Sequence, residues 1–515
     1  MEHIIANGEL VLPSVVLASI TLFVFRALDP NTVANSIVSY VINKYLNWRY
    51  PIWSADGTAP IPTVPYKFPN GKESAKFLHG ETVSCEWAKM YGPIYRIWTG
   101  LQPEIVLTRP EDIKTTYRDS DTHLKAGDLN AGWVLGELIG DGVGMLSGPD
   151  WKRVHTVVAP AFAQKASVYV PTVMARVERH FATIEKTRMQ GARKEFILKT
   201  AEDLNAIPFW IMSDIVYGQL PSAMEAELTD MIKLRNELWS YTFKGGWSLF
   251  SISKLCSPGI RNKLKMFDRR WDEFNDLAYD HVCSQGKTSM PIQDLYKAEH
   301  AGRVKRSEFL HSLSESLFTN IDVTMGTYTW ILILLAMHPE IQTELREEIN
   351  QAQAASTTEA WHHYLSSNST LLACCIMESG RLRPIANYTY PQYLPKDRVV
   401  AGYSIPKSTY FIIDTNAVNL RDPGWGDNAD QFQPSRFMNR PGSEHRYRLW
   451  RFGFGARQCL AQALADTMLK GLIVYIIARY KVSIPGGLAK EEDWKSRKED
   501  TWFSMAENAV LCEEL

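Results

Sequence analysis

The sequence predicts a mainly α-helical fold with small β-sheets, because stretches with helical periodicity far outnumber strand-like segments. Apolar residues recur at three- and four-residue spacing through four long stretches, as they do in helices that bury one face. These stretches are Val173–Ile184, Leu264–Val282, Glu308–Met337 and Leu460–Ala478. The third ends at His338–Pro339, where a proline cannot continue a helix.

The strand-like segments are short. Ile94–Trp98 and Pro103–Leu107 flank Gly100 and predict a pair of strands. Asn387–Asp414 is rich in Tyr, Val, Ile and Pro and predicts a small β-rich insert. Because no repeat or low-complexity tract divides the rest of the chain, we expect one large domain over residues 77–515.

The composition limits the classes of partner. The 515 residues carry a net charge of −1, so no overall field favours nucleic acid, and we expect no nucleic-acid partner. The seven cysteines are scattered and form no CxxC pair, which argues against a zinc site and a disulfide framework. This usage is typical of reduced thiols in a cytosol-facing protein.

An uncharged apolar run near the N-terminus predicts a single membrane anchor over residues 1–28. Leu10–Phe25 is somewhat short of the ~20 residues that span a bilayer, and a cleaved signal peptide or a core helix are the alternatives. Acidic residues precede the run, whereas Arg26, Lys44 and Arg49 follow it, which places the body of the protein in the cytosol.

Residues 29–76 are expected to join this anchor to the domain. Val33–Leu46 is a second, weaker apolar stretch that fits a position along the membrane interface. Further on, residues 60–69 contain four prolines, which fix backbone torsions and remove amide donors. We therefore expect a stiff, extended connector.

The segment with the strongest chemical signal is Phe452–Ala461, a glycine-rich loop that carries Cys459 to the start of a long apolar helix. Gly453 and Gly455 permit backbone torsions that are costly for other residues. Amides at a helix N-terminus favour negative charge, which predicts a thiolate at Cys459. Arg457, two residues earlier, is placed to bind an anion such as a carboxylate.

This segment resembles the cysteine loop of the cytochromes P450, Phe-x-x-Gly-x-Arg-x-Cys-x-Gly, and departs from it only at Ala461. The resemblance implies the cytochrome P450 fold around a buried haem b (iron protoporphyrin IX). It assigns Cys459 as the axial ligand of the iron, Arg457 as a partner of a haem propionate, and Phe452 as a residue of the haem-binding loop. A thiolate ligand of this kind favours O–O cleavage.

Other motifs of the family follow in the expected order. Glu378–Arg381 resembles its Glu-x-x-Arg pair, and Phe432–Phe437 resembles the arginine segment that completes a buried triad. Trp151 and His155 resemble the propionate donors of the family, although an arginine usually stands at the second position. Residues 385–395 contain no basic residue, which leaves Tyr388 or Tyr390 to replace the usual one.

The long helix carries the most informative departure from the family. Asp322 matches the acid of the family's proton relay and Thr324 its second threonine, whereas Asn320 replaces glycine and Val323 replaces the first threonine. The resemblance implies that Asp322, Thr324 and Asn320 deliver protons. Because valine cannot relay a proton, either Thr324 substitutes for the missing alcohol, or the reaction is oxidative coupling, desaturation or ring formation.

The resemblance implies a monooxygenase that takes O₂ and receives electrons from NADPH–cytochrome P450 reductase. Its location would be the endoplasmic reticulum membrane, crossed once, with the haem-thiolate domain in the cytosol. Asn320–Thr324 resembles a fungal subset that acts on secondary metabolites, so we expect a small apolar or aromatic substrate. The alternatives are a haem-thiolate isomerase or dehydratase, and a non-catalytic haem protein.

Two sets of residues are predicted around this centre. Bulky aromatic side chains are expected to wall the substrate: Trp133, Phe209, Trp210, Trp239, Phe243 and Trp247. Basic side chains near the cysteine loop are expected to dock an acidic reductase: Lys152, Arg153, Arg440, His445, Arg446, Arg448 and Arg451.

Overall fold

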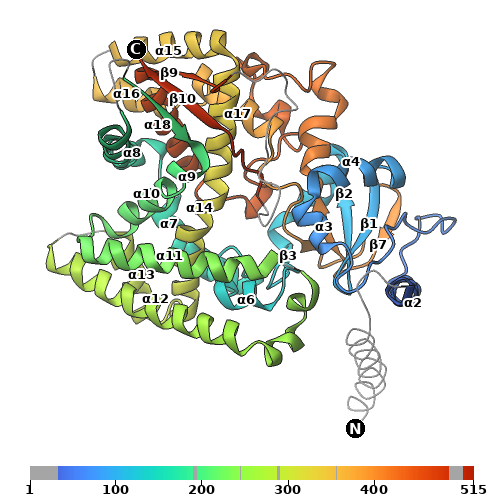
Figure 1. Cartoon of the computed structure of the whole chain (residues 1–515). Helices are drawn as coiled ribbons and strands as arrows, with labels where there is room; N and C mark the ends of the chain where they lie inside the picture. Colours follow the sequence, from blue (N-terminus) through green and yellow to red (C-terminus); the bar gives the residue numbers. More distant parts are fainter. Residues whose placement is uncertain (1–32, 190–193, 244, 287–289, 355–356, 487–502) are drawn as a thin grey trace.

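The computed structural model describes residues 33–189, 194–243, 245–286, 290–354, 357–486 and 503–515 (Figure 1). The predicted anchor over residues 1–28 lies outside these ranges. Helices dominate the described chain, in agreement with the predicted class. They are α2 (Val33–Arg49), α3 (Glu73–Leu78), α4 (Gly80–Tyr91), α5 (Pro110–Thr116), α6 (Trp133–Ile139), α7 (Gly148–Phe162), α8 (Ala166–Arg188), α9 (Thr200–Asp203), α10 (Ile207–Tyr217), α11 (Ser222–Phe243), α12 (Pro258–Ser284), α13 (Pro291–His300), α14 (Arg306–Met337), α15 (Pro339–Ala354), α16 (Thr358–Ser366), α17 (Leu371–Leu382) and α18 (Gln462–Arg479).

Helix α14 runs through the middle of the helical body and packs against α6, α10, α17 and α18. It is apolar on nearly every side, as a helix surrounded by other helices must be. Among the described residues it is the one helix long and apolar enough to cross a bilayer, yet 67% of its apolar window is buried inside the protein. Its neighbours show that it is a core helix.

The strands form small sheets that flank the helices. They are β1 (Ile94–Thr99), β2 (Gln102–Leu107), β3 (Leu124–Lys125), β4 (Glu195–Lys199), β5 (Gln392–Tyr393), β6 (Arg398–Val400), β7 (Tyr403–Ile405), β8 (Tyr410–Ile413), β9 (Tyr480–Ser483) and β10 (Ala509–Glu514). One sheet has the order β1-β2-β8-β5-β3, a second β4-β10-β9, and a third β6-β7.

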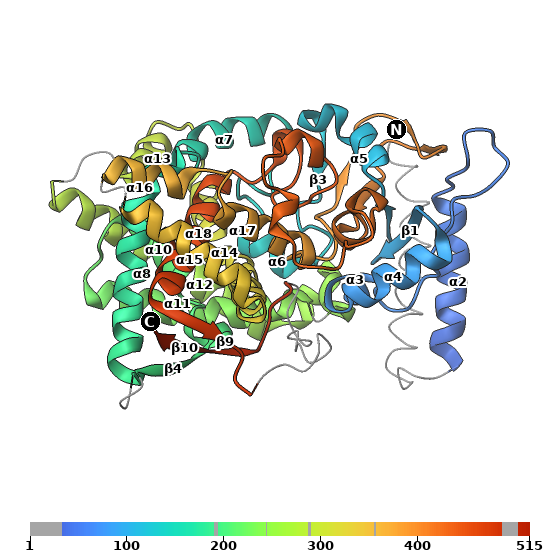
Figure 2. The ribbon, with the colours of Figure 1, turned by 90° about the horizontal axis from the view of Figure 1, so that it is seen from above.

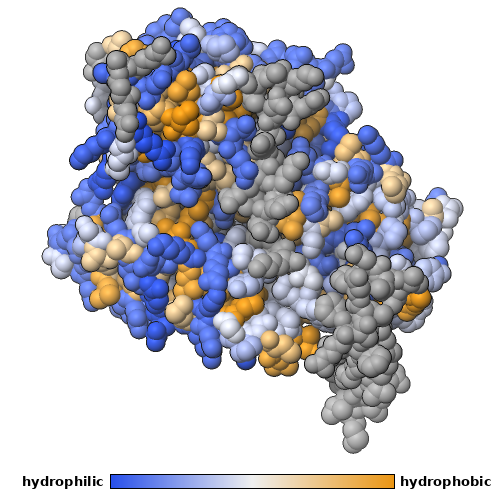
Figure 3. Space-filling model, in the orientation of Figure 1, coloured by the Kyte–Doolittle hydropathy of each residue, from blue (hydrophilic) through white to orange (hydrophobic). Residues whose placement is uncertain are grey.

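The predicted strands and the β-rich insert are confirmed. β1 pairs with β2 in antiparallel register, with Ile94 opposite Leu107, and β8 of the insert adds to β2 in parallel. The chain therefore joins segments that lie about 300 positions apart in sequence into one sheet. Hydrophilic residues cover most of the face seen in Figure 3, and the apolar residues of this fold lie mainly inside.

The predicted connector does not stand away from the domain. The amide of Val64 donates to the carbonyl of Arg96 on β1, and the amide of Arg96 donates to Pro62. Tyr66 and Phe68 are buried in one small cluster with residues of α2 and Trp98. Figure 2 shows α2 at the outer edge of the molecule, with β1 and α4 on its inner side.

A buried ion pair joins α3 to the first sheet. Nζ of Lys76 lies 2.7 Å from Oε2 of Glu104 on β2, and both side chains are fully buried. Asn130 donates to the other carboxylate oxygen of Glu104 at 2.8 Å. The buried ammonium of Lys76 on α3 and the buried carboxylate of Glu104 on β2 thus neutralise each other.

We expect Lys76→Met to lower the free energy of unfolding by about 3–5 kcal/mol, because Glu104 would stay buried without its cation. Urea unfolding followed by tryptophan fluorescence measures the change. Lys89→Met, at an exposed lysine of α4, is the control and should change stability by less than about 0.5 kcal/mol. Equal stability of the two variants would contradict this role for the pair.

Candidate active site

A cavity of about 340 Å³ lies in the middle of the domain, between α14 and the loop that precedes α18. Large parts of its wall come from α7, α14, the segment that follows α17 and the loop before α18. The lining residues include Lys125, Val143, Gly144, Trp151, His155, Phe162, Met212, Glu315, Ser316, Thr319, Asn320, Val323, Thr324, Ile385, Thr389, Tyr390, Phe452, Arg457, Cys459, Leu469 and Phe503.

The cysteine loop is held in a shape that requires glycine. Gly453 and Gly455 have φ of +84° and +71°, and a Cβ on Gly455 would lie 1.9 Å from Oγ of Ser120. The amide of Cys459 donates to the carbonyl of Phe452 at 2.8 Å, which closes the loop. The Cys459 side chain lines the cavity, as the predicted iron ligand must.

The helix predicted to favour a thiolate at Cys459 begins later than expected, and the thiolate itself stays a prediction. Helix α18 begins at Gln462, three residues after Cys459 and not directly after it. Burial raises the pKa of the Cys459 thiol, and the amide of Ala461, which lowers it, is the smaller effect. A coordinated metal ion deprotonates a bound thiol, so it would lower the pKa of Cys459 where the helix does not.

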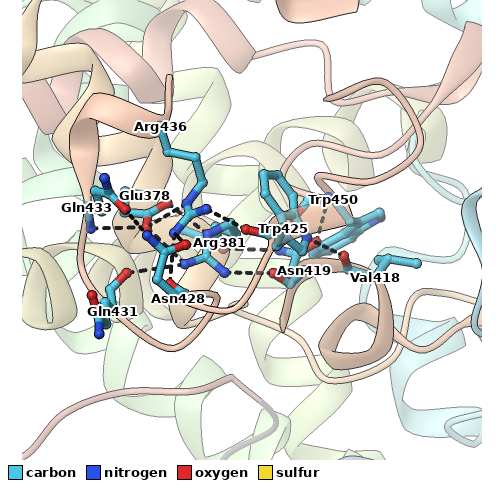
Figure 4. A network of polar contacts seen from close by, with 11 residues as sticks. Glu378, Arg381, Val418, Asn419, Trp425, Asn428, Gln431, Gln433, Arg436 and Trp450 are labelled. Atoms are coloured by element: carbon cyan, nitrogen blue, oxygen red, sulfur yellow. Dashed lines mark hydrogen bonds and ion pairs between the residues drawn. The ribbon is translucent and has the colours of Figure 1, made fainter. Parts of the chain in front are cut away.

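The predicted triad forms in this structure (Figure 4). Arg381 donates to both carboxylate oxygens of Glu378, at 2.8 and 2.9 Å, and both side chains are fully buried. Nε of Arg436 lies 3.3 Å from the same carboxylate. Further nitrogens of the two arginines donate to the backbone carbonyls of Asn419, Trp425 and Asn428. Nearly every donor therefore has an acceptor, as buried charges require.

Asn419, which the sequence analysis did not single out, connects the triad to the cysteine loop. It lies in a π-helical turn, Ala417–Arg421, and its side chain accepts from the amide of Trp450 at 2.7 Å. Its amide group donates to the carbonyl of Trp450 at 2.9 Å and to that of Gly380 at 3.2 Å. An asparagine in a loop carries no sequence signal for this role.

Three predicted propionate-binding residues meet at one end of the cavity. The guanidinium of Arg457 lies 4.5 Å from the centre of the Trp151 ring, and the rings of Trp151 and His155 are 4.9 Å apart. Burial and the charge of Arg457 lower the pKa of His155, so this histidine is neutral near pH 7 and can donate one hydrogen bond.

Lys125 joins them, although the sequence analysis missed it. Its ammonium group donates to the carbonyl of Gly144 at 2.8 Å and lies 5.8 Å from the centre of the Tyr390 ring. Burial, followed by the nearby charge of Arg457, lowers the pKa of Lys125 to about 8. A single lysine on a two-residue strand gives little signal in the sequence, and only the fold brings it beside Arg457.

These residues fit a haem. Two half-buried cations, Lys125 and Arg457, lie at the same end of the cavity, and the buried Nη1 of Arg457 has no hydrogen-bond partner within the described chain. A pair of carboxylates would satisfy both cations. Apolar side chains such as Phe162 and Leu469 face the remaining space, and the Cys459 thiol is available to an iron atom.

On α14 the structure separates the predicted relay residues. Asn320 and Thr324 both line the cavity, and the hydroxyl of Thr324 donates to Oδ1 of Asn320 at 2.7 Å. Val323 lines the cavity as well. Asp322 does not: it is half-buried and interacts electrostatically with Arg235 of α11. The helical turn of about 100° per residue explains why neighbours on this helix face different surroundings.

The aromatic residues expected to wall the substrate lie elsewhere. Trp133, Phe209, Trp210, Trp239 and Trp247 are all absent from the cavity wall, and the side chain of Phe243 is outside the described part. Phe209, for example, is buried against Phe318 in the helical core. Composition alone could not separate core aromatics from those of a cavity.

A helical domain whose central cavity presents a thiol and, at one end, two cations defines a haem-thiolate protein. The chain belongs to the cytochrome P450 family, whose model matches residues 68–500. It is 42% identical to the cytochrome P450 monooxygenase roqR of Penicillium rubens over 98% of this chain and 99% of that protein. The chain is also 36% identical to the cytochrome P450 monooxygenase aclC of Aspergillus oryzae, over 91% of this chain and 95% of that protein.

A solved structure confirms the fold. A zebrafish cytochrome P450, determined with progesterone, superposes with a TM-score of 0.67 and 17% identity over 84% of this chain and 99% of its own. The predictions of a cytochrome P450 fold and of a monooxygenase with a haem-thiolate centre are confirmed. As a member of this family, the enzyme takes a small-molecule substrate, O₂ and electrons from a redox partner.

We expect Asn419→Ala to reduce the fraction of protein that retains haem, because Trp450, at the start of the cysteine loop, would lose its two hydrogen bonds with the Asn419 side chain. Haem content per protein after gel filtration measures the effect. Asn416→Ala is the matched control, since Asn416 lies in the same region but donates to Asn387. Equal losses in the two variants would mean that Asn419 has no special link to the loop.

We expect Lys125→Met to raise the rate of haem transfer to apomyoglobin about tenfold or more, because one charge-assisted hydrogen bond contributes about 1.5–3 kcal/mol. Lys125→Arg, which keeps the cation, should stay near the parent rate. An unchanged rate of haem transfer in Lys125→Met would show that Lys125 does not bind the haem.

Proposed function

We propose that this enzyme uses haem b and O₂ to oxidise a small, largely apolar molecule, a secondary metabolite, with electrons from NADPH–cytochrome P450 reductase. The observation that carries the proposal is the Cys459 side chain lining a cavity whose wall also holds Asn320 and Thr324. The mainly apolar character of the other lining residues supports an apolar substrate, and the fungal monooxygenases among the relatives support the metabolite class.

The bound haem would supply the oxidising chemistry, and side chains of this protein would manage protons. The Thr324 hydroxyl, hydrogen-bonded to Asn320 at the cavity wall, is placed to hold a proton and to exchange it. This arrangement supports the substitution of Thr324 for the alcohol that Val323 lacks. The catalytic role of Asp322 stays a prediction.

Part of the predicted basic patch remains available for a reductase. Three of its arginines form ion pairs inside this chain: Arg153 with Glu308, Arg448 with Asp422, and Arg451 with Asp466. His445 is buried, and burial lowers its pKa. Arg440, Arg446 and Lys152 are exposed, so the proposed docking of an acidic partner rests on these three.

We also propose that α2 lies in the surface of the endoplasmic reticulum membrane, beside the anchor predicted for residues 1–28, with the catalytic domain in the cytosol. One face of α2 packs on the domain through Ile42 and Leu46. The other face exposes large apolar and aromatic side chains: Ile37, Tyr40, Val41, Tyr45 and Trp48. Tyrosine and tryptophan favour the membrane interface, which supports this placement.

The dithionite-reduced protein under carbon monoxide should show the strongly red-shifted Soret band of a thiolate-ligated haem. We expect this band to be lost in Cys459→Ala. NADPH consumption with added reductase should likewise require Cys459. A band at the position typical of histidine-ligated haem, unchanged in the variant, would contradict the assignment.

A fluorescent nitrobenzoxadiazole label on Val41→Cys should shift to the blue when the full chain is reconstituted in phosphatidylcholine vesicles. The apolar interface that surrounds the label is the physical reason. Met90→Cys, at an exposed residue of α4, should show no shift after the signal of the labelled parent is subtracted. Equal emission at the two positions would place α2 in water.

A further inference from the structure

Glu315, on α14, brings a carboxylate to the wall of the cavity that Cys459 also lines. Its side chain is only half-buried, although α14 runs through the core, because it borders this open space. The cavity wall is otherwise mainly apolar and includes Val143, Phe162 and Leu469. A carboxylate that exchanges its hydration for such surroundings is costly unless a partner compensates it.

Within the described chain, only one of the two carboxylate oxygens of Glu315 has a hydrogen-bond partner. Oε2 accepts from the amide of Gly144 at 2.9 Å, which holds the loop at residues 141–146 against α14. Oε1 retains accessible surface and accepts no hydrogen bond from the described residues. Burial raises the pKa of Glu315, and the Gly144 amide offsets this effect only in part. One oxygen therefore faces the cavity with its hydrogen-bonding capacity unused.

The two cations closest in effect to Glu315 have other partners. Lys125 and Arg457 act on its charge at longer range, and neither forms an ion pair with it. Their nitrogens donate to the carbonyls of Gly144 and Leu146. Both cations also fit the two propionates of a haem. A haem bound there would cancel these two charges and leave the carboxylate of Glu315 without a compensating cation.

The chemistry of the unused oxygen selects the kind of substrate group. A carboxylate accepts hydrogen bonds and attracts cations, whereas it disfavours a second carboxylate or a phosphate nearby. A neutral N–H or O–H group would satisfy Oε1 but would leave the charge of Glu315 uncompensated. A protonated nitrogen supplies both the hydrogen bond and the opposite charge.

We propose that Glu315 is a specificity-determining residue that binds a protonated nitrogen of the substrate, which defines the substrate class as a largely apolar molecule with a basic nitrogen. This inference rests on the proposed monooxygenase function, because it places the substrate in the same cavity as the haem. Oε1 accepts from the nitrogen while Oε2 keeps its bond to Gly144. The apolar wall receives the rest of the molecule.

The test uses imidazoles that bind a haem iron through one nitrogen and report binding through the Soret band. The amine probes are 1-(3-aminopropyl)imidazole and its homologues one methylene shorter and longer. Each is compared with the alkyl probe that carries a methyl group in place of the amine, such as 1-butylimidazole. At about pH 8 the amine is a cation and the imidazole is neutral.

We expect the amine probe of at least one length to bind the parent enzyme about tenfold more tightly than its alkyl counterpart, as a charge-assisted hydrogen bond provides. In a mainly apolar cavity without an acceptor, an ammonium group binds more weakly than a methyl group. The proposal is therefore overturned if the parent enzyme prefers no amine probe at any length, and this comparison needs no variant.

Glu315→Gln separates substrate binding from support of the loop, because glutamine can still accept from the Gly144 amide but carries no charge. The preference for the amine should be lost in Glu315→Gln and kept in Glu315→Asp. Asp322→Asn is the matched control, since Asp322 is a half-buried carboxylate of the same helix that does not line the cavity. Survival of the preference in Glu315→Gln, or an equal loss in Asp322→Asn, would overturn the proposal.

The two proposals fail in different ways. If no imidazole probe shifts the Soret band of the parent enzyme, the haem site itself is wrong and the proposed function fails. If the probes shift the band and the parent enzyme prefers no amine probe, the haem site stands and the inference about Glu315 is wrong.

Discussion

The buried charge network of Glu378, Arg381 and Arg436 is the constraint on which the active site depends. Its members come from α17 and from a segment more than 50 residues later, and they meet where water cannot compensate an unpaired charge. Removing one partner of such a pair costs far more than the pair contributes, so the network tolerates few alternative arrangements. Through Asn419 it fixes the backbone at Trp450, and thereby the start of the cysteine loop.

Another part of the cavity wall is fixed by the loop at residues 141–146. The amides of Val143 and Gly144 donate to Ser312 and Glu315 of α14. A Cβ on Gly144 would lie 1.7 Å from Oε1 of Glu315, so a larger residue here would displace the Glu315 carboxylate. The carbonyls of the same loop accept from Lys125 and Arg457. One short segment therefore connects the cations at the end of the cavity to the helix that forms its wall.

The buried polar groups of this protein differ in how well their hydrogen bonds are satisfied. The triad is well satisfied and supports the loop, whereas Arg235 and Nη1 of Arg457 are buried without hydrogen-bond partners in the described chain. Groups of the second kind destabilise the fold unless a bound molecule satisfies them.

The local pattern of the chain was enough to predict four of the helices, the β1–β2 pair and the cysteine loop, because each rests on spacing within a few residues. The triad was predicted from the resemblance to the family, since Arg436 lies far along the chain from Glu378 and Arg381. The thiolate at Cys459 stays a prediction, because burial, which is a tertiary quantity, raises the pKa of the thiol more than the amide of Ala461 lowers it.

By itself, the sequence determined that this protein is a haem-thiolate enzyme, since the ligand and its loop form one continuous motif. Only the tertiary structure decided which side chains share the cavity. It placed Lys125 beside Arg457, turned Asp322 toward Arg235, and left the expected aromatic residues outside the cavity wall. The physical reason is that these relations join residues up to several hundred positions apart, and depend on how helices pack and rotate against one another.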